Sequence, residues 1–203
     1  MQLYSVFLLV AATAVASPGP GVVMTLTNAL RYGFVGSLAG ILGIACGGSI
    51  VAAISATSLG VLVGNSTLAF NVIKFVGAAY LVYLGVRLWR APPFRFVARD
   101  ATAVSFKRRW AEALTMQFTN PKAIVFFLAV FPQFIDAHAA YAPQFALLVL
   151  TYGVLVLVIH GLYALFAARA KRWLTSERGG AIANRTAACM FVCFGAALAT
   201  AKR

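Results

Sequence analysis

The sequence predicts an all-α membrane protein with several spans, from its hydropathy, its shortage of charge and the length of its uncharged stretches. The chain has 203 residues, of which 62% are hydrophobic and 10% are charged, unlike an ordinary soluble domain. The stretches 1–30, 32–73 and 137–168 hold no Lys, Arg, Asp or Glu. One membrane crossing takes about 20 apolar residues, so each stretch can provide at least one spanning helix.

Six membrane spans are expected, in two groups of three. We place them near residues 3–28, 36–59, 67–87, 111–132, 144–168 and 183–201. The basic linker 91–110 separates a first half, 1–90, from a second half, 111–203. Because each half has an odd number of spans, the second half enters the membrane in the opposite sense to the first. This polytopic arrangement is that of two inverted three-helix repeats, as in many secondary transporters.

The positive charge indicates the orientation of these spans rather than a nucleic-acid partner. The formal net charge is +13, and 13 of the 17 Lys and Arg residues fall at position 31 or within 87–109 and 169–185. Basic residues collect in the cytoplasmic loops of membrane proteins. With six spans, all three segments lie in the cytoplasm and both chain termini lie outside it. We expect no nucleic-acid binding.

Prolines break the first and the fourth predicted span at corresponding places. The breaks comprise Ser17, Pro18, Gly19 and Pro20 in the first span, and Asn120 and Pro121 in the fourth. Pro20 and Pro121 are 101 positions apart. Proline removes a backbone donor and interrupts a helix, and broken helices in both halves point to a transporter's binding site near the membrane midplane. We therefore predict that these six residues bind substrate; kinks that serve packing alone are the alternative.

Lys122 is the cation that the hydropathy pattern places near the middle of the fourth span. An ammonium group there costs about 2.5–3.5 kcal/mol on insertion scales, so it is expected to face a cavity or a partner. We predict that Lys122 holds a substrate carboxylate, while backbone carbonyls freed at the breaks receive the amino group. Snorkelling to the membrane surface is the alternative.

Three further residues are candidates for coupling transport to an ion gradient: Lys74, Glu112 and His160. Each has a structural alternative, namely snorkelling for Lys74, an ion pair with neighbouring arginines for Glu112, and a hydrogen-bonded core position for His160. No Asp or Glu lies deep in any predicted span. This pattern disfavours a cationic substrate and a simple carboxylate proton relay.

Motifs of enzymes and ATP-driven pumps are missing from the sequence. The chain has no P-loop, HExxH or GxSxG pattern, so we expect a protein that is not an enzyme and uses no cofactor. Cys46, Cys189 and Cys193 have no acidic or histidine partners nearby in the sequence, and we expect no metal site. An intramembrane thiol-disulfide carrier, a further alternative, needs a cysteine pair that can meet, and neither the first nor the fourth span has a cysteine.

Four motifs follow one another over nearly the whole chain. They are Ser-Pro-Gly-Pro at 17–20, a glycine ladder through the second span, the segment 73–85, and the paired segments 118–123 and 131–134. In this combination the sequence resembles the lysine exporter family, and its homoserine/threonine resistance branch of amino-acid exporters in particular. Two positions depart from that pattern: Gly21 stands where the family commonly has Asp or Asn, and Ala113 stands where glycine is usual.

The resemblance implies six spans in a bacterial inner membrane and secondary active export of amino acids or their derivatives by alternating access. The partners would be a small zwitterionic solute, a coupling ion (a proton being the simplest), and the lipid bilayer. The solute, the ion and the choice between a monomer and a homodimer stay open. A degenerate family member acting as a non-transporting scaffold is the alternative that Gly21 supports and that the intact Asn120-Pro121-Lys122 motif opposes.

Overall fold

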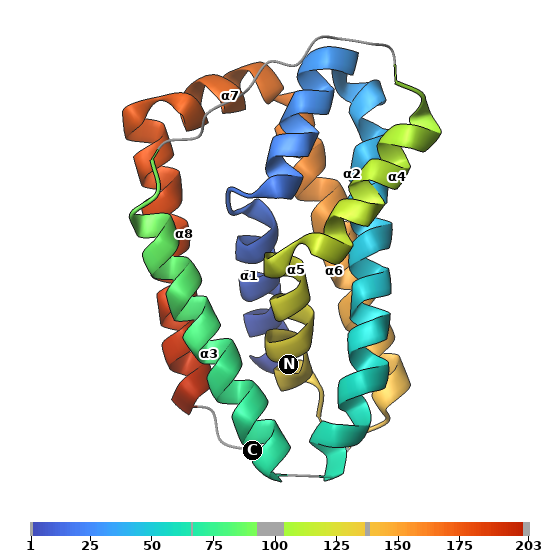
Figure 1. Ribbon diagram of the computed structural model, residues 1–203, viewed down its shortest axis with the longest axis vertical. Helices are drawn as coiled ribbons and strands as arrows, with labels where there is room; N and C mark the ends of the chain where they lie inside the picture. The colour runs from blue at the N-terminus through green and yellow to red at the C-terminus, as the bar shows by residue number, and fades with distance from the viewer. Residues whose placement is uncertain (1, 66, 93–103, 137–138, 201–203) are drawn as a thin grey trace.

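Helices form all the regular structure of the residues that the computed structural model describes, 2–65, 67–92, 104–136 and 139–200. Figure 1 shows an elongated bundle whose helices run along the long axis, with α7 (Ala167–Thr175) lying across one end. The predicted all-α class is confirmed.

The first half of the chain contains α1 (Gln2–Ala16), α2 (Pro20–Asn65) and α3 (Thr67–Trp89). Helix α2 is not one straight rod, because Gly33 has φ 70° and ψ −177°, a conformation that glycine adopts without the steric cost of a Cβ atom. The chain turns back there (Figure 1), so that Asn28 and Gly40 face each other on the two arms. The predicted first span therefore corresponds to α1 together with the first arm, 20–32.

The second half contains α4 (Phe106–Thr119), α5 (Pro121–Val125), a π-helical turn (Phe126–Val130), a 3-10 turn (Phe131–Phe134), α6 (Tyr141–Leu165), α7 and α8 (Glu177–Thr200). Helix α4 begins inside the predicted linker, and residues 93–103 of that linker lie outside the described residues. The division of the chain at 91–110 stays a prediction. The short helix α7 was not anticipated within the basic segment 169–185.

Three helices of the described residues are long and apolar enough to cross a membrane on their own. By length and composition, they are Pro20–Ser55, which includes the turn at Gly33, Tyr141–Leu165 and Glu177–Ala197. A fourth crossing results if Phe106–Thr119 and Lys122–Phe134, which meet at an angle of 60°, form one broken span. The helices Tyr4–Ala16 and Phe75–Trp89 are apolar but shorter. The structure thus has the helices of a multi-spanning membrane protein, and the count of six spans stays a prediction.

Glycines bring α2 into close contact with α4. A Cβ atom at Gly47 would lie 2.8 Å from the Leu114 carbonyl oxygen, and one at Gly43 would clash with the Trp110 carbonyl oxygen. Small residues of this kind let helix backbones approach each other in lipid, where the solvent supplies no hydrophobic drive for association. The close approach fixes α4, and with it the second proline break, against the middle of α2.

Helices α3 and α8 pack antiparallel (Figure 1) through a reciprocal contact. A Cβ atom at Gly85 of α3 would lie 2.9 Å from the Ala188 carbonyl oxygen, and one at Gly195 of α8 would lie 2.9 Å from the Ala78 carbonyl oxygen. In each helix the alanine precedes the glycine by seven residues. The two helices thus present the same pattern to each other, as helices related by a two-fold axis would.

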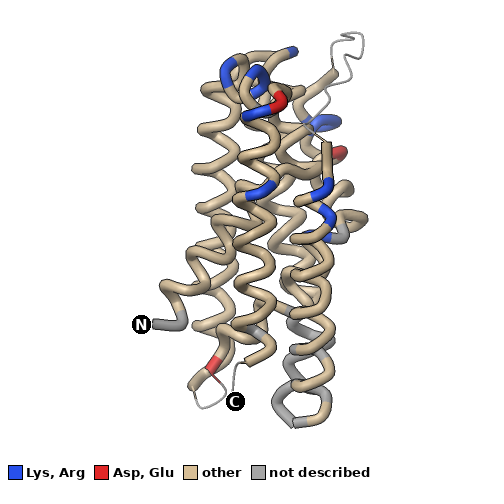
Figure 2. The backbone as a smooth tube through the Cα atoms, turned by 90° about the vertical axis from the view of Figure 1, so that its left-hand side faces the viewer, with Lys and Arg blue, Asp and Glu red and all other residues tan. Residues whose placement is uncertain are grey.

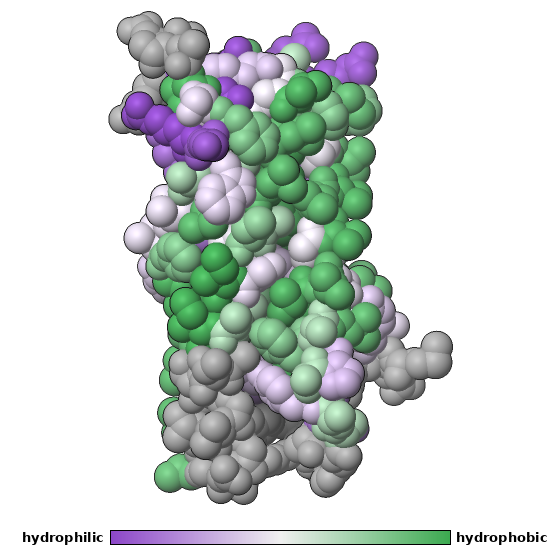
Figure 3. Space-filling view, turned by 90° about the vertical axis from the view of Figure 1, so that its right-hand side faces the viewer, coloured by the Kyte–Doolittle hydropathy of each residue, from purple (hydrophilic) through white to green (hydrophobic). Residues whose placement is uncertain are grey.

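Charge and hydropathy are distributed along the long axis of the molecule. Lys and Arg gather toward the upper end in Figure 2, whereas α1 begins and α8 ends in the lower half. The face shown in Figure 3 is largely apolar between its ends. Val35, Leu68 and Leu150 are each at least 69% exposed. Such an extended apolar surface suits contact with lipid.

Candidate functional site

The two proline breaks meet inside the bundle. Helix α1 ends at Ala16 and α2 begins at Pro20, while α4 ends at Thr119 and α5 begins at Pro121. Lys122, in the first turn of α5, donates from its Nζ to the Ser17 carbonyl oxygen and to Ser17 Oγ, both at 3.1 Å. These two hydrogen bonds join residues 105 positions apart and bring together the predicted binding segments of both halves.

At the first break, the carbonyl groups at the end of α1 have partners. The Tyr163 hydroxyl donates to the Ala16 carbonyl oxygen at 2.8 Å, and Ser17 Oγ donates to that of Ala14 at 3.0 Å. The last carbonyls of a helix lack intrahelical donors and carry partial negative charge. The partial negative charge at the end of α1 therefore stabilises the Lys122 ammonium group, which bonds to the Ser17 carbonyl oxygen, in this apolar environment.

The second break is held by Asn120, which is 5% exposed. Its Oδ1 accepts from the Lys122 backbone N–H at 3.1 Å, which caps α5, and its Nδ2 donates to Gln117 Oε1 at 3.0 Å. Pro121 stands at the first position of α5, where a helix needs no backbone donor. Asn120 therefore bonds to the backbone that Pro121 interrupts.

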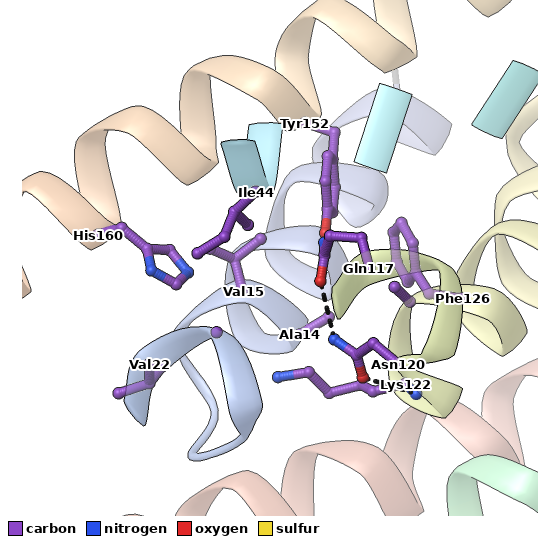
Figure 4. A pocket seen from close by; sticks show the side chains of 12 residues that line it. Ala14, Val15, Val22, Ile44, Gln117, Asn120, Lys122, Phe126, Tyr152 and His160 are labelled. Atoms are coloured by element: carbon purple, nitrogen blue, oxygen red, sulfur yellow. Dashed lines mark hydrogen bonds between the residues drawn. The ribbon is translucent and has the colours of Figure 1, made fainter. Parts of the chain in front are cut away.

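A small cavity lies between the two breaks (Figure 4). Polar groups come from Gln117, Asn120, Lys122, Tyr152 and His160, and the remaining lining comprises Ala14, Val15, Gly21, Val22, Ile44, Ala123 and Phe126. The volume is about 20 Å³, enough for about one water molecule and far below the roughly 300–1,000 Å³ of ligand pockets. The structure is thus a closed form, and a solute would enter only after the helices separate.

His160 lies on the α6 side of this cavity and is 3% exposed. Its Nδ1 shares a hydrogen bond of 2.6 Å with Thr25 Oγ1 on the first arm of α2. One helical turn before Thr25, a Cβ atom at Gly21 would lie 3.2 Å from His160 Cε1 and 3.6 Å from Ile44 Cδ1. The absence of a side chain at position 21 therefore leaves the space beside the imidazole ring open.

The remaining predicted residues are placed as follows. Gly19 lies beside Lys122, since a Cβ atom there would be 3.2 Å from Nζ, and Pro18 precedes it in the same break. Glu112 pairs with Arg108 at 3.0 Å on the exposed surface of α4 and is not among the cavity-lining residues. Lys74 belongs to α3, but its side chain lies outside the described part of the structure.

Three polar residues of the site were missed by the sequence analysis: Thr25, Gln117 and Tyr152. The Tyr152 hydroxyl lies against the Gln117 amide (Figure 4), which in turn accepts from Asn120. Helical spacing could have found two of them, because Thr25 is four residues after Gly21 and Gln117 is three before Asn120. Among the described residues, no group of three or more His, Cys, Asp or Glu could hold a metal ion.

Comparison with known proteins gives the site its family context. A family model described as LysE type translocator matches residues 12–202. The homoserine/homoserine lactone efflux protein of Salmonella typhimurium is 34% identical over 196 residues, which cover 97% of this chain and 95% of that protein. An uncharacterized membrane protein of Vibrio cholerae is 35% identical over 202 residues, covering 100% and 98%.

A leucine efflux protein of Salmonella choleraesuis is 29% identical over 200 residues, covering 97% of this chain and 94% of that protein. No solved structure matches. The family match spans nearly the whole chain, including both proline breaks and the cavity between them. The protein belongs to the LysE type translocator family, a membrane transporter family of amino-acid efflux.

Proposed function

We propose that this protein is a secondary active exporter of amino acids or amino-acid derivatives that works by alternating access in the bacterial inner membrane. One observation carries the proposal. The ammonium group of Lys122, on one broken helix, bonds to the backbone of the other broken helix at the wall of a closed cavity. Family membership supports export as the direction of transport and amino acids as the class of solute.

The substrate carboxylate is proposed to replace Ser17 as the partner of Lys122. It would also lie near the N-terminus of α2, where Gly21 and Val22 provide the first backbone N–H groups because Pro20 has none. Helix N-termini favour anions, and half-helix N-termini in transporters point at anionic substrate groups. The substrate ammonium group would bind the Ser17 carbonyl oxygen, which Lys122 releases when it binds the carboxylate.

The lining of the cavity favours a neutral side chain on the substrate. Among the described residues that line it, none is acidic, whereas its apolar lining includes Val15, Val22, Ile44 and Phe126. A second ammonium group would find no carboxylate there. Homoserine and leucine, the solutes in the names of relatives, are the first candidates to test.

Alternating access is supported by the closed cavity and by the reciprocal packing of α3 and α8. Six spans arranged as two inverted repeats would place a two-fold axis between these helices, as the matching Ala-to-Gly spacing suggests. The basic end of the molecule would then face the cytoplasm. Of the two coupling candidates whose side chains the structure describes, Glu112 and His160, His160 is the one among the cavity-lining residues, and we assign proton coupling to it.

Efflux from reconstituted liposomes tests the proposal. Vesicles with the purified protein are loaded with radiolabelled leucine, homoserine or lysine, and release is followed with and without a proton gradient. We expect gradient-dependent release of a neutral amino acid and none of lysine. Lys122→Met should lower the rate about tenfold or more, since a hydrogen bond to a charged group contributes about 1.5–3 kcal/mol.

Lys107→Met is the matched control, because Lys107 is an exposed lysine in the first turn of α4 and should transport normally. Release of a neutral amino acid at the same rate by wild type and Lys122→Met would refute the assigned role of Lys122. No release of any amino acid by folded wild-type protein would favour the non-transporting scaffold.

A further inference from the structure

A groove of about 400 Å³ opens on the outside of the bundle where α6 meets α7. Its floor comprises Ile159, Leu162, Tyr163 and Phe166, and α7 contributes Arg169 and Trp173. Leu162, Phe166 and Trp173 are 47–52% exposed. The groove is therefore apolar along α6 and ends at a guanidinium group and an indole ring.

The position of the groove matches the boundary between lipid chains and headgroups. Helix α7 lies across the end of the bundle (Figure 1), at the end where Lys and Arg gather (Figure 2). It has the sequence AARAKRWLT, with three basic residues and a tryptophan in nine positions. Short basic amphipathic helices with such aromatic residues lie in the membrane interface and attract anionic lipids.

We propose that this groove binds an anionic phospholipid, with an acyl chain along Leu162 and Phe166 and the headgroup phosphate at Arg169. Charge complementarity selects this occupant, because α7 contributes only basic charge and basic pockets on this side of membrane proteins bind anionic headgroups. A zwitterionic lipid would fill the apolar floor equally well but would carry no net charge for Arg169.

The groove shares a residue with the proposed transport site. Tyr163 lines the groove, and its hydroxyl donates to the Ala16 carbonyl oxygen at the first break. Its ring also meets His160 edge-on, with 6.4 Å between centroids. A lipid in the groove therefore contacts the side chain that holds the end of α1, and we expect it to favour the closed form. This second step depends on the proposed function, whereas lipid binding does not.

Native mass spectrometry of the purified protein tests binding directly. The protein in detergent is titrated with dioleoylphosphatidylglycerol or with dioleoylphosphatidylcholine. We expect a preference for phosphatidylglycerol that weakens about fivefold in Arg169→Gln, since one basic residue contributes about 1 kcal/mol at an anionic surface. Arg178→Gln is the control, with the same charge change at an exposed position of α8 that does not line the groove. Equal binding by wild type and both variants would overturn the proposal.

Transport measurements test the second step separately. In liposomes of phosphatidylcholine with and without phosphatidylglycerol, efflux by wild type and Arg178→Gln should depend on the anionic lipid, and efflux by Arg169→Gln should not. If Arg169→Gln loses lipid binding but keeps the same lipid dependence of efflux, the link through Tyr163 is wrong and the site remains. If wild type binds phosphatidylglycerol but exports nothing, the proposed function fails while the lipid site stands.

Discussion

Replacing Gly21 by alanine is a direct test of where the solute binds. The new Cβ atom would lie 3.2 Å from His160 Cε1 and 3.6 Å from Ile44 Cδ1, and the cavity that would receive it holds only about 20 Å³. Overpacking costs about 1–3 kcal/mol. Exchange of glycine for alanine at a compatible backbone position returns about 0.4–1 kcal/mol. We therefore expect a loss of stability no larger than about 2.5 kcal/mol.

The effect on transport should be larger than the effect on folding. In an apolar pocket, one methylene group more or less changes the discrimination between two substrates by about 10–200-fold. The alanine methyl group would occupy space of this kind beside the polar lining of the cavity. We expect KM for the exported amino acid to rise about tenfold or more in Gly21→Ala. The maximal rate should fall less, because Lys122 and His160 are retained.

The assay is concentration-dependent efflux from liposomes, with thermal unfolding of the same preparations in detergent. Gly161→Ala is the matched control: it adds the same methyl group next to His160 in sequence, at a position with no atom within 4 Å of the added Cβ. Unchanged efflux kinetics in Gly21→Ala would refute the reasoning, because the solute would then not occupy the space between α2 and His160. Equal losses in both variants would show a general effect of alanine.

Two further predictions concern a hydrogen bond of the site and the packing of α3 against α8. Thr25→Val removes the 2.6 Å hydrogen bond to His160 Nδ1. Because the buried nitrogen is then unpaired, thermal unfolding should show a loss of stability of about 1–3 kcal/mol. An unchanged unfolding temperature would contradict the pairing. Gly85→Ala and Gly195→Ala each place a Cβ atom 2.9 Å from a carbonyl oxygen, so both should destabilise the α3–α8 pair by similar amounts, about 1–3 kcal/mol. Gly153→Ala, with nothing within 4 Å, should leave stability unchanged, and very unequal effects at Gly85 and Gly195 would argue against a two-fold relation.

Hydropathy and proline placement predicted much of the fold, because both act locally. Proline and glycine interrupt the apolar runs at the places where helices stop and restart. Helix α1 ends at Ala16 and α2 begins at Pro20, and likewise α4 ends at Thr119 and α5 begins at Pro121. The turn at Gly33 depends on a positive φ, which a glycine permits but does not require, so the sequence could not assign it. Helix α7 was missed because its nine residues give less than three turns of periodicity.

An internal repeat in the sequence was also missed. Helix α3 reads Ala78-x3-Val82-x2-Gly85, and α8 has the same three residue types at the same spacing from Ala188 to Gly195. Three matching positions do not identify a repeat among apolar helices, because Ala, Val and Gly are common there. The structure identifies the repeat, since each glycine faces the alanine carbonyl of the other helix.

The candidate site could be predicted in its segments but not in its contacts. Polar and helix-breaking residues inside an apolar span indicate both segments of the site, 17–20 and 120–122. The pairing of Lys122 with Ser17 and of His160 with Thr25 depends on how α1, α2, α5 and α6 pack, which no local pattern encodes. Glu112 illustrates the reverse case, since its pairing with Arg108 four residues earlier follows from helical spacing.

The contact between Lys122 and Ser17 also explains why a zwitterion would suit this site better than an amine or an acid. Insertion of the ammonium group costs about 2.5–3.5 kcal/mol, and its two hydrogen bonds to Ser17, at about 1.5–3 kcal/mol each, offset that cost. A carboxylic acid that captured Lys122 would leave the Ser17 carbonyl oxygen buried and unpaired, at about 1–3 kcal/mol. An amine that captured this carbonyl would take one of the two Ser17 partners of the Lys122 ammonium group. An amino acid provides both groups at once, so its carboxylate can take Lys122 while its ammonium group takes the Ser17 carbonyl, and neither broken helix loses a partner as the closed contact opens.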